Sequence, residues 1–411
     1  MGINISSNYI PAININTGIS VSGILSVSSN SLYDVTNYQT VNINITKPED
    51  FLETRLMTPS QITSYSNNNL TYLAPATFYS TTIKAASFPA CTSIGTSAFY
   101  YCWSLTTAIF PNCTTIGDNV FNYCISLSSV NFPNCTRIGN YAFYYCSSLT
   151  SADFPACTSI GTSAFYSCRS LTTASFPVCT RIDNNAFCLC SALTSVNFPA
   201  CTSIDTSAFY GCPSLTSVNF PVCTSIGSSA FQYCRSLTTV SFPLCTSIGQ
   251  GAFGECSALT SVNFPSCTSI NSYAFSGCTT LVNISFPVCT SIGAYAFQYC
   301  RSLTSVSFPV CKSIGMYAFR SCNSLTTASF PACTYIAGYA FRSCYNLLSL
   351  YLLGSILCSL SSVEAFTSTP ISNYTTSTGG VYGSIYVPAS LYSSYIISTN
   401  WVTYSSRFVS V

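Results

Sequence analysis

The chain has 411 residues, of which 12 are Lys or Arg, 10 are Asp or Glu and none is His, and its formal net charge is +2. Binding to nucleic acid or to an anionic membrane surface requires clustered basic residues, so this balance predicts neither partner. Apolar residues make up 48% of the chain, but Ser, Thr or Asn interrupts every apolar run before the ~18 residues that a membrane-spanning helix needs, so no membrane insertion is expected.

Residues 1–46 are predicted to form a small N-terminal β module. The stretch from Ser26 to Ile45 alternates in the way that short strands do. The first 20 residues contain no Lys or Arg and no unbroken apolar core, so no secretory signal peptide is expected. Residues 47–77 mix acidic and basic side chains and are interpreted as a linker and N-terminal cap.

Residues 78–350 repeat a unit of 22 residues about twelve times. Proline recurs at this period from Pro89 to Pro331, a cysteine follows two positions after each proline, and a second cysteine series runs from Cys102 to Cys344. Phenylalanine falls every 11 residues from Phe88 to Phe341, so each unit consists of two related halves. A fixed period in this range predicts a solenoid, in which stacked coils bury a continuous core.

Within one unit, the stretch from Leu127 to Phe132 ends in strict alternation, which predicts a strand with one face buried. The proline that follows ends the strand and turns the chain. The glycine of the I-G pair is expected to form a second corner with a positive φ. The segment from that glycine to the second cysteine is too short for more than one turn of helix or 3₁₀ structure. The predicted fold is therefore a mainly β repeat solenoid with a parallel sheet on one face and turns or short 3₁₀ segments on the other. The glycines at this corner include Gly95, Gly117, Gly139 and Gly161.

The cysteines are predicted to form two ladders of buried free thiols inside the stack, because like residues lie above like when the coils are in register. Metal sites use Cys pairs two to four residues apart or Cys with His, and an 11-residue spacing without His offers neither. Disulfides between neighbouring coils remain an alternative on distance, although parallel Cβ vectors fit the required dihedral poorly. The close pair Cys188 and Cys190 is interpreted as a substitution at a surface position beside the ladder. The first ladder residues are Cys91, Cys102, Cys113, Cys124, Cys135 and Cys146.

After Cys344 the repeat decays, and residues 351–411 are predicted to form a C-terminal cap. The segment from Gly383 to Val411 is expected to contain a strand, a short helix and a second strand. A solenoid requires such an end, because its last coil would otherwise expose core and an unpaired strand edge.

The repeat resembles a known family. L-x-x-V-x-F-P-x-C-x-x-I, from Leu127 to Ile138, resembles the leucine-rich repeat pattern L-x-x-L-x-L-x-x-N/C-x-x-L, with Cys135 in the ladder position. The companion sequence TSIGxxAFxxCxSL is similar to the BspA-like branch of that family. The resemblance covers about residues 78–350 and implies a right-handed coil of the leucine-rich repeat type. It also implies a surface-exposed binding or adhesion protein without catalytic activity.

The residue inventory argues against an enzyme. General acid–base catalysis needs His or paired carboxylates, but the repeat array has no His, and its few carboxylates lie mostly on different coils. A thiol nucleophile needs a nearby base. We therefore expect no catalytic residue, no metal and no cofactor.

Two faces of the solenoid are candidates for ligand binding. The strand face carries Ser, Thr or Asn on nearly every coil, as at Thr107, Ser129 and Asn131. The other candidate is a pair of columns in which the units differ and carry Tyr, Trp and Arg, the residues that binding surfaces favour. Neutral variation at a tolerant surface is the alternative interpretation of those columns. The predicted ligand-binding residues are Tyr100, Tyr144, Tyr166, Tyr210 and Arg320 after alternate phenylalanines, and Trp103, Arg169, Arg235 and Arg301 after the second cysteine.

The expected function is recognition of a glycan or surface protein of a host cell. A phage tail or decoration protein assembles in the cytoplasm, which suits 26 mostly reduced cysteines, so a virion-associated attachment protein is favoured. A bacterial cell-surface adhesin of the BspA-like type is the second hypothesis. A purely structural or ice-binding solenoid, suggested by flat Ser and Thr rows, is the third. The expected location is extracellular, on a virion or a cell surface.

Overall fold

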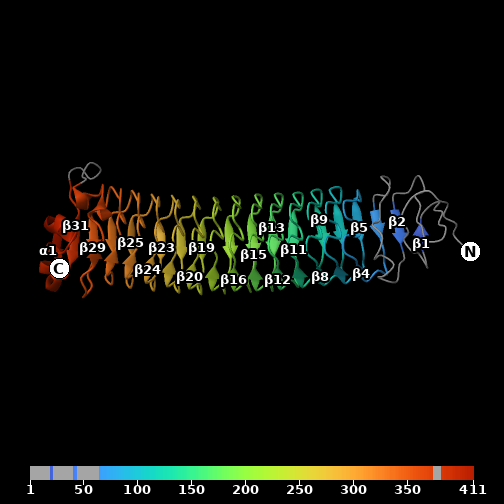
Figure 1. Ribbon diagram of the computed structural model, residues 1–411, viewed down its shortest axis with the longest axis horizontal. Helices are drawn as coiled ribbons and strands as arrows, with labels where there is room; N and C mark the ends of the chain where they lie inside the picture. Colours follow the sequence, from blue (N-terminus) through green and yellow to red (C-terminus); the bar gives the residue numbers. More distant parts are fainter. Residues whose placement is uncertain (1–18, 22–39, 44–63, 374–380) are drawn as a thin grey trace, which may run out of the picture. The chain divides into compact units, whose positions relative to one another are not determined.

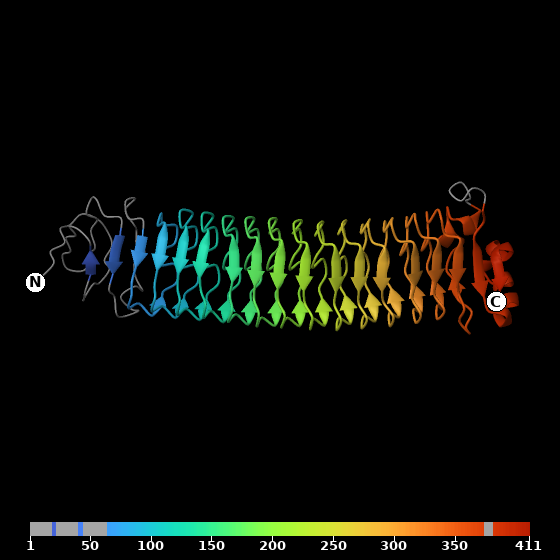
Figure 2. The same cartoon turned by 180° about the vertical axis from the view of Figure 1, so that it is seen from behind.

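The computed structural model describes residues 19–21, 40–43, 64–373 and 381–411, and the chain divides into two compact units, Met1–Pro199 and Ala200–Val411. In both units one coil recurs every 22 residues, and each coil contains a three-residue strand, a two-residue strand and a six-residue turn. Within each unit the strands form two rows, which Figures 1 and 2 show from opposite sides. This parallel β-solenoid of about 15 coils confirms the predicted fold class.

In unit 1 the strands pair in parallel and in register, with partners one coil apart such as Ser151 and Thr173. The N-terminal strand β1 (Ile19–Val21) runs antiparallel to β2 (Thr40–Ile43), and β2 pairs in parallel with β3. The three-residue strands are β3 (Ser64–Ser66), β5 (Ala85–Ser87), β7 (Thr107–Ile109), β9 (Ser129–Asn131), β11 (Ser151–Asp153), β13 (Thr173–Ser175) and β15 (Ser195–Asn197). The two-residue strands are β4 (Tyr72–Leu73), β6 (Ser93–Ile94), β8 (Thr115–Ile116), β10 (Arg137–Ile138), β12 (Ser159–Ile160) and β14 (Arg181–Ile182).

The coil pattern is already present at residue 64, because β3 and β4 pair with the equivalent strands of the next coil. A coil therefore occupies part of the segment 47–77 that the sequence analysis assigned to a linker and cap. Of the predicted β module at residues 1–46, β1 and β2 lie within the described residues. The proposed boundary between residues 46 and 47 lies outside them.

Unit 2 repeats the same arrangement, again with partners 22 residues apart, such as Ser247 and Ser269. Its three-residue strands are β17 (Ser217–Asn219), β19 (Thr239–Ser241), β21 (Ser261–Asn263), β23 (Asn283–Ser285), β25 (Ser305–Ser307), β27 (Thr327–Ser329) and β29 (Ser349–Tyr351). Its two-residue strands are β16 (Ser203–Ile204), β18 (Ser225–Ile226), β20 (Ser247–Ile248), β22 (Ser269–Ile270), β24 (Ser291–Ile292), β26 (Ser313–Ile314), β28 (Tyr335–Ile336) and β30 (Ser359–Leu360).

The C-terminal segment closes unit 2 with the expected strand, short helix and strand. Strand β31 pairs in parallel with β29 on one side and with β32 on the other. Trp401 is fully buried and donates from its indole nitrogen to the carbonyl of Cys358 over 2.6 Å, so the cap is anchored to the preceding irregular coil. The elements of this segment are η2 (Val363–Phe366), η3 (Pro370–Ser372), β31 (Ser384–Val387), η5 (Ala389–Leu391), α1 (Tyr392–Ile397), η6 (Trp401–Arg407) and β32 (Phe408–Ser410).

The core of each unit is built from stacked phenylalanines. Phe275, for example, stacks on the equivalent rings of the coils on either side, Phe253 and Phe297, at centroid distances of 5.4 Å. It also meets Phe264 and Phe286 of the second phenylalanine column edge-on, at 6.1 and 5.8 Å. Two interlocked columns of rings therefore run through the stack, which explains the 11-residue period of phenylalanine.

The glycines of the I-G corner serve a different purpose from the predicted one. Gly95, Gly117, Gly139 and Gly161 do not have positive φ, so that prediction is wrong. At these coils the backbone of the preceding coil passes close to the glycine: a Cβ added at Gly139 would lie 2.6 Å from the carbonyl carbon of Gly117. Glycine therefore allows close contact between coils here, although four other coils carry a larger residue at the same corner: Asp183, Asp205, Asn271 and Ala337.

Candidate ligand-binding face

The six-residue turns form the third side of each coil and have an unusual backbone. In the turn at residues 96–101, Ser97 and Tyr101 have φ of 58° and 60°, and Phe99 between them is buried in the core. The amides of these three residues each donate to a carbonyl of the next coil over 2.9 Å. The turns therefore form a hydrogen-bonded side of the stack that holds outward side chains at a fixed spacing. We call this side the turn face.

A continuous cluster of tyrosines covers the turn face of unit 1. Tyr144 stacks on Tyr166 at 4.9 Å and meets Tyr145 edge-on at 4.8 Å. Tyr123 stacks on both Tyr101 and Tyr145, at 4.9 and 5.0 Å. The rings are linked edge to face and face to face, so they form one surface, which we call the tyrosine surface. Its members are Tyr79, Tyr100, Tyr101, Tyr123, Tyr141, Tyr144, Tyr145 and Tyr166.

The turn face of unit 2 combines tyrosines with arginines. Four tyrosines from successive coils stack in one column, at centroid distances of 4.6, 4.9 and 4.9 Å. Arg320 lies over two rings, Tyr299 at 5.7 Å and Tyr317 at 5.4 Å. Such guanidinium–ring contacts hold the arginine side chains against the surface. The stacked tyrosines are Tyr273, Tyr295, Tyr317 and Tyr339.

The structure places the predicted residues of unit 1 in two settings. Tyr100, Tyr144 and Tyr166 are half-buried members of the tyrosine surface. Arg169 is exposed, and its Nε donates to the Ser167 hydroxyl over 3.1 Å. Trp103 is 46% exposed and, among the described residues, has no ring contact, so it stands apart from the tyrosine surface.

In unit 2 the predicted residues lie beside tyrosines that were not predicted. Arg235 and Arg301 are exposed and lie over the rings of Tyr233 and Tyr299, at 5.6 and 5.7 Å. Tyr210 is half-buried and meets Tyr233 edge-on at 5.4 Å. Arg320 lies over Tyr317, the third ring of the stacked tyrosine column described above.

Sequence reasoning missed the tyrosines two residues before and after the buried phenylalanine of each turn. Many of these positions have positive φ, a conformation that side chains other than Gly, Asn and Asp adopt rarely. A tyrosine is therefore not expected at such a turn position, and turn propensities give no reason to look for one there. Only the alignment of successive units, which places Tyr273, Tyr295, Tyr317 and Tyr339 in one column, would have found them.

The cysteines lie at two corners of each coil, and each series has its own hydrogen bond. The Cys91 series donates to the carbonyl two residues later, as from Cys91 Sγ to Ser93 O over 3.2 Å. The Cys102 series donates to a phenylalanine carbonyl of an earlier coil, as from Cys146 Sγ to Phe121 O over 3.1 Å. All 26 cysteines are buried and free. Burial raises the pKa of the Cys91 and Cys135 thiols to about 11.

Cys188 does not lie at the surface, as the sequence analysis expected. Its exposure is 5%, and burial raises the pKa of its thiol to about 11. The residue occupies the position that Tyr144 and Tyr166 hold in the two preceding coils, but its short side chain does not project beyond the turn. A small side chain at a turn position is therefore buried where a long one is half-exposed.

The described part of the chain offers neither a metal site nor a membrane-spanning element. No group of three or more His, Cys, Asp or Glu among the described residues is arranged to hold a metal ion. Within the same residues, no helix has the length and hydropathy to cross a membrane.

The model of a family described as "BspA type Leucine rich repeat region (6 copies)" matches residues 4–128, 71–178, 114–238, 158–282 and 246–369. The chain belongs to this BspA-type family. Proteins of the BspA type are generally surface or adhesion proteins. The matched range includes the coils that carry both the tyrosine surface and the stacked tyrosines of unit 2.

Three leucine-rich repeat proteins of known structure are similar to this BspA-type chain. A leucine-rich repeat protein from Bacteroides ovatus is 25% identical, with a TM-score of 0.56 over 78% of this chain and 88% of that one. A leucine rich cell surface protein from Faecalibacterium prausnitzii is 23% identical, with a TM-score of 0.39 over 80% and 94%. The leucine-rich repeat protein of T. pallidum is 30% identical over 43% and 72%, with a TM-score of 0.32. A comparison with curated proteins found no match.

Proposed function

We propose that this protein is a non-catalytic attachment protein whose turn face binds a glycan or a surface protein of a host cell. The observation that carries the proposal is the tyrosine surface of unit 1. Planar aromatic rings offer apolar stacking area with a polar tip, which suits both sugar rings and protein partners. Eight such rings in mutual contact form a far larger recognition surface than single exposed residues provide.

The fold itself does not require tyrosine at these positions. Ser97 and Ser163 occupy the same backbone position as Tyr141, with φ of 58°, 54° and 56°. A left-handed conformation costs a side chain other than glycine roughly 1–2 kcal/mol, so glycine would be the cheapest choice. Because serine and glycine satisfy the turn in other coils, the tyrosines are better explained by what they present to the outside.

We further propose that the protein acts as a tail or decoration component of a phage virion. Support comes from the 26 free, buried thiols, which suit folding in a reducing cytoplasm. A bacterial cell-surface adhesin is the second candidate, and membership of the BspA-type family favours it. Mass spectrometry of purified virions and of proteins released from intact cells by protease would distinguish the two locations.

The test of attachment uses the full chain, fluorescently labelled, and its binding to host cells measured by flow cytometry. Replacing both Tyr144 and Tyr166 by Ala removes a stacked pair at positions without positive φ, so the turn backbone is not disturbed. We expect cell binding to weaken by about tenfold, as for the loss of an interface hot spot, with little change in melting temperature. The pair Tyr100→Ala and Trp103→Ala should have the same effect.

The control variants lie on the strand face, where Ser129→Ala and Ser151→Ala alter two exposed hydroxyls. These changes should leave binding unchanged. Loss of binding in the strand-face variants, with normal binding by the tyrosine variants, would move the ligand to the sheet. Thermal hysteresis in ice-growth assays would instead support the ice-binding alternative.

A further inference from the structure

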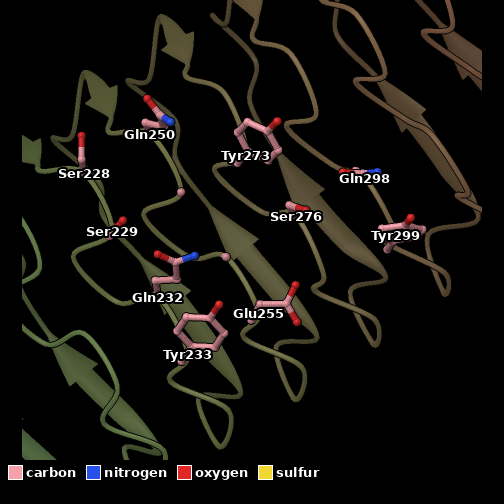
Figure 3. Close-up of a pocket in the computed structure, with 12 residues that line it drawn as sticks. Ser228, Ser229, Gln232, Tyr233, Gln250, Glu255, Tyr273, Ser276, Gln298 and Tyr299 are labelled. Atoms are coloured by element: carbon pink, nitrogen blue, oxygen red, sulfur yellow. The ribbon is translucent and has the colours of Figure 1, made fainter. Parts of the chain in front are cut away.

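The turn face of unit 2 contains a hollow of about 570 Å³, a volume within the usual range of about 300–1,000 Å³ for small-molecule sites. It forms where small residues replace large ones in successive coils. Gly254 and Ser276 occupy the column that carries Gln232 before them and Gln298 after them. Gly251 occupies the positive-φ position that Tyr273 holds in the next coil. Figure 3 shows the side chains that surround this hollow.

The stacked tyrosine column of unit 2 ends at this hollow. Tyr273 stacks on Tyr295 at 4.6 Å, and among the described residues this is its one ring contact. Gly251 stands where the next ring of the column would lie, so the other face of Tyr273, which is 40% exposed, is not covered by a ring. A flat, partly apolar ligand could continue the stack at this point.

Polar groups surround the same space. Glu255 lies between Tyr233 and Tyr299 in Figure 3, and Gln232 lies beside it. The Glu255 carboxylate lies directly over Gly277, because a Cβ added there would be 2.4 Å from Glu255 Oε1. Gln232 lies over Gly254 in the same way, with its Nε2 at 3.4 Å from an added Cβ. The glycines therefore let an acid and an amide lie along the floor of the hollow.

The charge of the hollow restricts its ligand. Glu255 is the one charged residue that lines it, and among the described residues it forms no ion pair. Three arginines, Arg235, Arg301 and Arg320, lie over the rings of Tyr233 and Tyr299 at its edges, so the charges around the hollow include both signs and favour neither a strong anion nor a strong cation. Carboxylate, amide and phenol groups together suit a neutral molecule with many hydroxyls.

We propose that the hollow binds a neutral saccharide, with one sugar ring stacked on Tyr273 above Gly251 and with hydroxyls bound by Glu255 and Gln232. The inference rests on the proposed attachment function and specifies the class of glycan and a second contact region. Tyr233 and Tyr299 are three coils apart, about 14 Å at a strand spacing of ~4.8 Å, so an oligosaccharide fits better than a single sugar.

The decisive variant is Gly251→Tyr. Tyr273 and Tyr295 adopt φ of 61° and 60° at the equivalent position, and Gly251 has φ of 63°. The nearest atom to a Cβ added at Gly251 is the Ser229 hydroxyl, at 3.6 Å, so the turn has room for the substitution. The new ring would extend the tyrosine column and occupy the place assigned to the sugar. The matched control is Thr239→Tyr, which adds the same side chain at an exposed position of strand β19.

The experiment titrates the full chain with neutral trisaccharides of glucose, galactose and N-acetylglucosamine, with trigalacturonate and with spermidine, using calorimetry and saturation-transfer NMR. We expect at least one neutral trisaccharide to bind. Gly251→Tyr should weaken this binding by about tenfold or more, and Glu255→Gln should weaken it severalfold because a charged acceptor is lost. Thr239→Tyr should leave it unchanged.

The proposal is overturned if no neutral trisaccharide binds, if trigalacturonate or spermidine alone binds, or if Gly251→Tyr binds as well as the unaltered chain. If Gly251→Tyr fails to fold, Glu255→Gln takes its place as the test. An unchanged trisaccharide affinity in that variant would show that the Glu255 carboxylate does not bind the sugar and would overturn the proposal. Host-cell binding that is lost in the Tyr144 and Tyr166 variant but kept in Gly251→Tyr would leave the attachment function standing without this saccharide site. Trisaccharide binding without any cell binding would support the saccharide site and contradict the attachment function.

Discussion

The thiol of Cys124 donates a hydrogen bond to the backbone carbonyl of Phe99, 25 residues earlier in the chain, with an Sγ–O distance of 3.1 Å. The equivalent bond recurs along the second cysteine series, as from Cys256 to Phe231 and from Cys300 to Phe275. Each of these carbonyls also accepts the amide of the cysteine three residues after it, so the thiol adds a second hydrogen bond, and this one crosses between coils. Cysteine combines this weak donor with the small apolar volume that the corner requires.

Thiol reagents should therefore distinguish folded from unfolded protein sharply. We expect native protein to react with almost no 5,5′-dithiobis(2-nitrobenzoic acid), and protein in denaturant to expose nearly all 26 thiols. Counting the released chromophore over the first minutes measures both states. Prompt reaction of a dozen or more thiols in native protein would contradict the buried ladders.

Stability should fall steeply in alkaline solution. Burial raises the pKa of Cys91 and of Cys223 from 9.0 to about 11. Between pH 9 and 11 the unfolded chain loses these protons while the folded chain keeps them, so the free energy of unfolding decreases as pH rises. The contribution of these buried thiols to the free energy of unfolding is fully present below pH 9. Between pH 9 and 11 each thiol lowers that free energy by up to about 1.4 kcal/mol per pH unit.

Circular-dichroism melting at pH 7, 9, 10 and 11 measures this dependence. The melting temperature should change little from pH 7 to 9 and drop over the next two units. Cys91→Ala should flatten the decline slightly, because one titrating thiol is removed. A melting temperature that is constant up to pH 11 would show that the thiols are not shielded from water.

Truncating a central ring should create a costly cavity. Phe275→Ala removes a side chain held between Phe253 and Phe297 and should destabilise the protein by roughly 3–5 kcal/mol. Val288→Ala, at a position that is 41% exposed, should change stability by about 0.5 kcal/mol or less. Chemical denaturation of the two variants provides the comparison. Similar midpoints for both would contradict a stack of interdependent coils.

Two glycines test the close approach between coils. A Cβ at Gly249 would lie 2.4 Å from the carbonyl carbon of Gly227, whereas a Cβ at Gly338 would have no atom nearer than 3.5 Å. Neither residue has positive φ, so the two substitutions differ from each other in the steric contact that the added Cβ makes and not in backbone strain. Gly249→Ala should lower the melting temperature clearly, and Gly338→Ala should leave it unchanged or raise it slightly. The opposite order would refute the contact explanation.

The 22-residue period was sufficient to predict the solenoid, because each coil can bury its apolar side only against another coil. The row of two-residue strands, such as β20, was not predicted, since two residues are too few to show alternation. The I-G glycines were noticed but misinterpreted, because sequence alone does not reveal how close the preceding backbone passes.

The candidate site was only partly predictable, because sequence alone does not show which side chains of neighbouring coils lie together. Tyr100 and Tyr144 stood out as variable residues beside a constant phenylalanine. The stack that begins at Tyr273, and the hollow beside it, depend on side-chain sizes in several successive coils. Such a feature becomes visible only when the units are laid side by side in their spatial register, as Gly251 beneath Tyr273 illustrates.

The in-register pairing of unit 2 has a consequence for the gene. Ser225 pairs with Ser247, and Ser247 pairs with Ser269, so these successive coils meet through the same residue type in this strand row. Unequal recombination that removes or duplicates one 66-nucleotide segment within these coils would leave their strand pairing unchanged. The length of the array can thus change by whole coils without any new kind of strand pairing, while point mutations change the side chains on its surface.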